Sequence, residues 1–73
     1  MNSELDSRLL DAHAGNNLAK IAYHYALAAD QAEGEEDIDQ ACFFLTHAWV
    51  FALEAGDPTA DEYRSRLAAY GRV

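Results

Sequence analysis

Two histidines are the residues of this 73-residue chain whose spacing could support chemistry. His24 and His47 lie equally far in sequence from the segment around residues 35 and 36, which we expect to be the turn of a helical hairpin. Such positions lie level in an antiparallel hairpin, and each histidine is about 100° around its helix from the predicted contact stripe. The two imidazoles could therefore share a metal ion or a proton, although a zinc site needs two further ligands. The alternative is that each histidine packs or forms hydrogen bonds locally.

The other reactive side chains do not form a recognisable site. Cys42 lies in the uncharged run from Ala41 to Leu53, where we expect an inert thiol, and it is about 140° around the helix from His47. The acids between Asp30 and Asp39 lack the register of a calcium-binding EF-hand loop. No nucleophile elbow, phosphate-binding loop or HExxH helix occurs. We therefore predict no enzymatic activity, no cofactor and no tight zinc or calcium binding.

Four helices are predicted, because the chain is rich in alanine and leucine, has one proline and shows no sustained period of two. The first spans about Glu4 to His13, the second about Leu18 to Glu33, and the third about Ile38 to Ala55. Asp57 caps the fourth, with Pro58 at its first position, and that helix ends before Gly71. The sequence thus predicts an all-α fold, a small bundle of three to four helices forming a single domain over residues 1–73.

The helix ends and faces follow from local patterns. We expect Gly34 to end the second helix, Asp37 and Gln40 to form a box-like cap on the third, and Gly56 to be its left-handed cap. The expected inward face of the second helix is Leu18, Ile21, Ala22, Tyr25, Ala28, Ala29 and Ala32. That of the fourth helix is Tyr63, Leu67 and Tyr70.

The third helix is apolar on so many sides that it must be central. Its two inward stripes are Ala41, Leu45, Ala48 and Ala52, and Cys42, Trp49 and Leu53. We expect Phe44 and the first stripe to be mostly buried, and Trp49 to be at least half covered. Phe43, Val50 and Phe51 lie off both stripes and predict an apolar patch through which two copies form a homodimer.

Charge and composition exclude several classes of function. A net charge of −8, with no Lys or Arg between Ile21 and Tyr63, argues against binding nucleic acid and would attract a basic protein. The apolar run is too short for a membrane span and is bracketed by Asp39 and Glu54. Acids near the N-terminus argue against a signal peptide, and the single cysteine excludes an internal disulfide. These features predict a cytoplasmic protein.

The second and third helices resemble the tetratricopeptide repeat, a helical hairpin. Leu18, Ile21, Ala22 and Tyr25 match its first helix, and Ala41, Leu45 and Ala48 match its second. The link between these half-patterns is about two helical turns longer than in the repeat, and Pro58 comes later than its proline. The segment "ACFFLTHA" is also similar to one in small uncharacterised bacterial proteins.

The resemblance implies a binding face. In the repeat family the first helix of the hairpin lines a concave surface where peptides lie, and Asn and Lys there can hold carbonyls or a carboxylate. The matching polar stripe here is Asn17, Lys20, His24 and Gln31. The alternative is a plain solvated face. We therefore predict a non-enzymatic protein–protein interaction module of the adaptor or scaffold kind; the alternative function is a small-ligand or metal-binding protein using His24 and His47.

Overall fold

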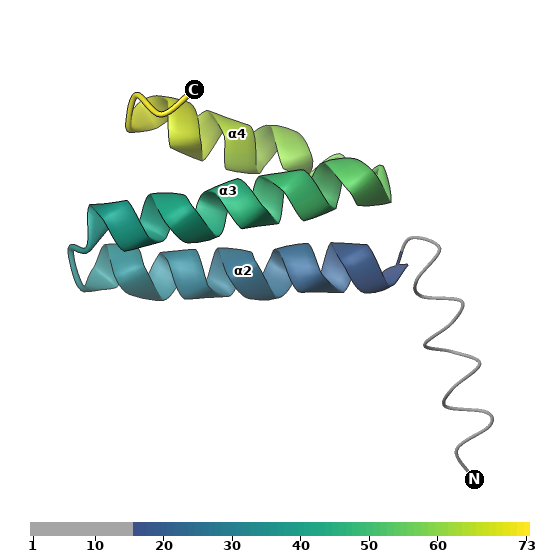
Figure 1. The fold of residues 1–73 in the computed structure, drawn as a ribbon, viewed down its shortest axis with the longest axis horizontal. Coiled ribbons are helices and arrows are strands. Elements are labelled where there is room, and N and C mark those ends of the chain that lie inside the picture. Colours follow the sequence, from purple (N-terminus) through teal and green to yellow (C-terminus); the bar gives the residue numbers. More distant parts are fainter. Residues whose placement is uncertain (1–15) are drawn as a thin grey trace, which may run out of the picture.

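The computed structural model describes residues 16–73 as three helices with no strand (Figure 1). These are α2 (Asn16–Gly34), α3 (Ile38–Ala55) and α4 (Ala60–Ala69). α2 and α3 lie side by side as an antiparallel hairpin, and α4 packs against the other side of α3. The all-α prediction is therefore confirmed for these residues, while the helix predicted at Glu4 to His13 lies outside them.

The cap on α3 forms as predicted in one half only. The Asp37 carboxylate accepts a hydrogen bond from the backbone N–H of Gln40 at 3.2 Å, which satisfies a donor that the first turn leaves free. In the reciprocal bond of a capping box, the backbone N–H of Asp37 would donate to the side-chain oxygen of Gln40. That N–H instead donates to the carbonyl of Ala32 at 2.9 Å, because it also closes the end of α2.

α2 ends at Gly34, as predicted, but its left-handed cap lies beyond that glycine. Gly34 is the last helical residue, and the left-handed conformation is taken two positions later by Glu36, at φ 62°. The bonds from Glu36 N–H to Glu33 and from Asp37 N–H to Ala32 form a Schellman motif, which requires a positive φ at Glu36. At the end of α3 the same motif uses Gly56, at φ 69°, as predicted.

α4 begins two residues later than predicted. The Asp57 carboxylate accepts hydrogen bonds from the Thr59 backbone N–H at 3.0 Å and from its hydroxyl at 2.8 Å, so Asp57 does hold the chain that enters the helix. Both bonds stabilise the ionised carboxylate and lower the pKa of Asp57, and the bond from the backbone N–H has the larger effect. Pro58 and Thr59 form a turn, and the regular helix starts at Ala60.

The core is built mostly from alanine. Its only fully buried large side chains within residues 16–73 are Leu45 and Leu67. Small residues allow helix backbones to approach closely, which explains why alanines dominate the α2–α3 contact. The buried hydrophobic residues are Ala22, Ala26, Ala29, Ala32, Ala41, Cys42, Leu45, Ala48, Ala52, Ala60, Tyr63 and Leu67. Phe44, Trp49 and Tyr70 are partly buried against them, so the burial expected of these three residues and of Leu45, Ala48 and Ala52 is confirmed.

The predicted faces of two helices differ in part from the observed ones. On α2 the buried face includes Ala26, which the pattern missed, while Ile21 and Tyr25 are only partly buried. The reason is that alanines make the closest approach, so larger side chains lie along the edge of the contact. On α3, Leu53 is 55% exposed although Cys42, on the same predicted stripe, is buried, so position along the helix decides the difference between them.

Candidate functional site

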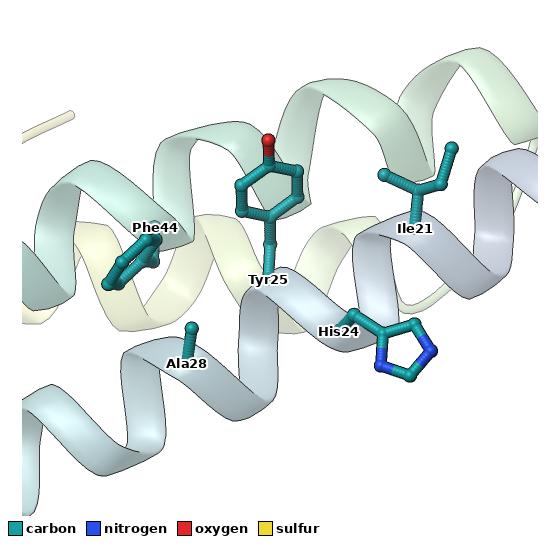
Figure 2. Close-up of a pocket in the computed structure, with 5 residues that line it drawn as sticks. All are labelled: Ile21, His24, Tyr25, Ala28 and Phe44. Atoms are coloured by element: carbon teal, nitrogen blue, oxygen red, sulfur yellow. The ribbon is translucent and has the colours of Figure 1, made fainter.

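Five rings form a cluster on one flank of the hairpin. The ring of Tyr25 on α2 packs near those of Phe44, His47 and Phe51 on α3, and the Phe43 ring packs near those of Phe44 and His47. The Tyr25 and Phe51 rings stack, with centroids 5.7 Å apart and planes at 7°, and the His47 ring lies 5.1 Å from Tyr25. We call these five residues the aromatic cluster. Seen from this flank, α4 runs behind the hairpin (Figure 2).

A groove runs along the same flank. Its first hollow has a volume of about 280 Å³ and is lined by Ile21, His24, Tyr25, Ala28 and Phe44 (Figure 2). A second hollow, also of about 280 Å³, is lined by Ala28, Gln31, Ala32, Glu35, Asp37, Gln40 and Phe44. The two hollows are adjacent, because Ala28 and Phe44 line both, and together we call them the hairpin groove. It is apolar at the Tyr25 end and acidic at the turn between α2 and α3.

The two histidines have different neighbours. His47 is oriented by a 2.9 Å hydrogen bond between its Nδ1 and the Phe43 carbonyl, in which the ring N–H donates. His24 is exposed, lies 6.0 Å from the ring of Tyr23, and turns away from α3 at the edge of the first hollow (Figure 2). Within residues 16–73 no group of three or more His, Cys, Asp or Glu side chains is placed to hold a metal ion.

The predicted polar stripe lies beside the groove. Lys20, His24 and Gln31 are exposed, and Asn17 is partly buried. His24 lines the first hollow and Gln31 the second, whereas Lys20 lines neither. The structure therefore brings two of the four predicted binding residues to the groove.

The three residues predicted to mediate self-association are not equivalent. Phe43 is 55% exposed and Val50 is 44% exposed. They share the outer face of α3 with His47, at spacings of four and three residues. Phe51, in contrast, is partly buried against the core, and its ring stacks on that of Tyr25. Phe51 therefore contributes to the packing of α2 on α3 rather than to the exposed surface. We call Phe43 and Val50 the outer patch.

Ion pairs distribute the acids unevenly. Arg66 on α4 donates to Asp30 at 2.6 Å and to Glu33 at 2.7 Å, and the Tyr70 hydroxyl also donates to Glu33. Arg72 pairs with Asp39 at 2.7 Å. Among residues 16–73, Glu35 and Asp37 take part in no ion pair, so the groove has net negative charge at its turn end.

The sequence reasoning missed the groove itself. It assigned Tyr25 and Ala28 to the buried face of the second helix and treated the acidic turn as solvated. The apolar residues and the acidic turn were therefore not recognised as parts of one surface. The available signal was the alignment of Ile21, Tyr25 and Ala28 on one stripe of α2, level with Phe44 and Phe51 on α3.

Comparison with family models, with curated proteins and with solved structures finds no match to this chain. The likeness to the tetratricopeptide repeat therefore stays a prediction from the residues. In the described part of the chain, no helix combines the length and hydrophobicity needed to cross a membrane.

Proposed function

We propose that this chain is a non-enzymatic protein–protein interaction module, and that a partner docks in the hairpin groove against the rings of Tyr25 and Phe44. The observation that carries the proposal is the open first hollow, whose walls are the rings of Tyr25 and Phe44. Aromatic walls provide large contact areas with little loss of side-chain freedom, and they dominate many protein interfaces. The resemblance to a peptide-binding repeat supports the same class of function.

The size of the groove favours a polypeptide over a small molecule. Pockets for drug-sized ligands have volumes of roughly 300–1,000 Å³ and enclose most of the ligand. Each hollow here is about 280 Å³ and opens along the helix seam, so it fits one or two side chains of a partner. A partner segment lying along the seam can fill both hollows in succession.

Site-specific photo-crosslinking tests this proposal. Benzoylphenylalanine placed at Ala28, between the hollows, is expected to form covalent protein adducts when the full chain is irradiated in its own cells. The matched control carries the same probe at Ala68, an exposed position on α4. Equal adducts from both positions, or none from Ala28, would contradict the proposed docking surface.

We also propose that a second copy of the chain packs on the outer patch. The supporting observation is that Phe43 and Val50 are both exposed on α3, while the core holds only two fully buried large side chains in residues 16–73. Domains of this size bury too little apolar surface to be very stable alone. Covering Phe43 and Val50 in a twofold dimer would add apolar burial without using the groove.

A further inference from the structure

We infer that the segment recognised by the hairpin groove carries one apolar side chain and one basic side chain. The inference rests on the proposed function and specifies the chemistry of the partner. It follows from the polarity of the groove, which changes from one hollow to the next. The first hollow accepts the apolar side chain, and the acidic second hollow accepts the lysine or arginine.

The first hollow is selective for an apolar group. Ile21, Ala28 and Phe44 present only hydrocarbon, and Tyr25 presents the face of its ring. His24 contributes the one other polar side chain, and its ring is turned outward at the rim (Figure 2). A buried polar group would find few hydrogen-bond partners there, whereas Leu, Ile, Met or Phe would lose only water contacts.

The second hollow is selective for a cation. Glu35 and Asp37 contribute carboxylates, and Gln31 and Gln40 contribute amide groups that can accept hydrogen bonds from an ammonium or guanidinium group. The nearby acids Asp30, Glu33 and Asp39 are already paired with Arg66 and Arg72, but Glu35 and Asp37 have no such pair in residues 16–73. A basic side chain would offset part of the negative charge of the turn.

The helix geometry sets the spacing of the two partner side chains. Tyr25 and Glu35 are ten residues apart, which corresponds to about 15 Å along a helix axis. An extended segment covers that distance in about four or five residues. The long Lys or Arg side chain shortens the required backbone span further, so we expect the base three to five residues from the apolar anchor.

Selection from a random twelve-residue display library tests the inference on the full chain. We expect enriched sequences with Leu, Ile, Met or Phe three to five positions from Lys or Arg. Selection against the Ala28→Trp variant, in which the indole fills the groove, should lose this enrichment. The matched control is Ala68→Trp on α4, which should retain it; circular dichroism checks that both variants fold.

The charge requirement is then measured with one enriched peptide by fluorescence anisotropy. Glu35→Lys should weaken binding by about five-fold or more, because it replaces attraction by repulsion at the base. Glu62→Lys makes the same change in net charge on α4 and should alter binding by less than about two-fold. Raising the salt concentration should weaken binding of the peptide to the wild type and reduce the difference in affinity between the wild type and Glu35→Lys.

The outcomes separate the inference from the proposed function. Enriched peptides that need an open groove but contain no base, or equal effects of Glu35→Lys and Glu62→Lys, would overturn the inference and leave the docking site standing. Identical selections from the wild type and Ala28→Trp would overturn both.

Discussion

At the scale of single residues, Glu36 is the one non-glycine residue within 16–73 that has a positive φ. It adopts a left-handed conformation, at φ 62°, that disfavours every residue with a Cβ atom. Glu36→Gly is therefore expected to stabilise the fold by about 0.5–1 kcal/mol, since the relief of strain exceeds the extra flexibility of glycine in the unfolded chain. Urea unfolding followed by circular dichroism measures this change.

Two glycines provide controls for that prediction. Gly34 is helical, and a Cβ there would contact nothing within 4 Å, so Gly34→Ala should also stabilise, through helix propensity. Gly56 has the left-handed φ of 69°, so Gly56→Ala should destabilise. If Glu36→Gly lowered the stability as Gly56→Ala does, the assignment of strain to Glu36 would be wrong.

Leu45 carries the second residue-scale prediction. It is fully buried and is one of only two large side chains in that state within residues 16–73. Leu45→Ala should lower the unfolding free energy by about 2–5 kcal/mol, enough to unfold a domain of marginal stability. Leu53→Ala, at a position 55% exposed, is the matched control and should have a small effect. A cooperative, wild-type-like thermal melt of Leu45→Ala would contradict the central role of α3.

Residue-scale prediction from sequence succeeds where one side chain determines the local backbone. Asp37 can accept a hydrogen bond from the N–H of Gln40, and Gly56 has no Cβ to oppose a positive φ. Both caps can therefore be predicted from the residue types alone. Glu36 is not readable in this way, because its conformation is imposed by bonds that join α2 to α3. Gly34 ends α2 as predicted, but the left-handed residue of the turn is Glu36.

At the scale of helices, Arg66 fixes the position of α4. Its guanidinium contacts Asp30 and Glu33 on α2, although α4 packs mainly on α3. Arg66→Met keeps the length of the side chain but removes the charge, and should destabilise the protein by about 1 kcal/mol, in line with partly exposed ion pairs. Amide hydrogen exchange should then accelerate in α4 more than in α2 and α3.

Arg64→Met is the control for that element-scale prediction. Arg64 is exposed on the same helix, so the substitution changes net charge equally. We expect little change in α4 exchange for this variant. Equal acceleration in both variants would mean that net charge, rather than the contacts of Arg66, holds α4 in place.

The faces of the helices are predictable only to about one residue in either direction. Helical periodicity identified α3 as central and placed Leu45, Ala48 and Ala52 inside, because they are spaced by three and four residues. It did not distinguish Ala26, which is buried, from Tyr25, which borders the groove. Both are apolar, and only the close packing of alanines against α3 decides between them.

At the scale of the whole molecule, tyrosine ionisation links stability to pH. Burial, followed by the charges of Asp57 and Glu62, raises the pKa of Tyr63, and a hydrogen bond to Glu33 raises that of Tyr70. The folded state therefore retains protons that the unfolded state loses above pH 10, the ordinary tyrosine value. Stability should be unaffected by these groups below that pH and should fall as the pH rises through their folded-state pKa values.

Thermal melts between pH 8 and 11 check this expectation. Tyr63→Phe removes one of the two groups, so its melting temperature should fall less steeply above pH 10 than that of the wild type. Absorbance at 295 nm follows tyrosinate formation directly. Parallel melting curves for the two proteins across this range would contradict the contribution assigned to Tyr63.

The candidate site could not be predicted in full from the sequence, because it depends on contacts between distant segments. Arg66 lies 33 residues beyond Glu33, and this pairing helps to hold α4 on one flank of the hairpin. The flank of Tyr25 and Phe44 is left to line the groove. The sequence identifies the aromatic rings and the acids by residue type. Which of them line the hairpin groove depends on how the three helices pack.

The predicted self-association uses the outer patch rather than the hairpin groove, and it should respond to salt in the opposite direction from peptide binding. Phe43 and Val50 are exposed, while the net charge of −8 repels a second copy. Salt screens this repulsion, so it should strengthen self-association while it weakens binding of a basic peptide to the groove.

Sedimentation equilibrium should show a dimer at high micromolar concentration, and the melting temperature should rise with protein concentration. A double Phe43→Ser, Val50→Ser variant should be monomeric, whereas Leu27→Ser, which changes an exposed leucine on α2, should still dimerise. A monomeric wild type at all salt concentrations would show that a second copy does not use the outer patch.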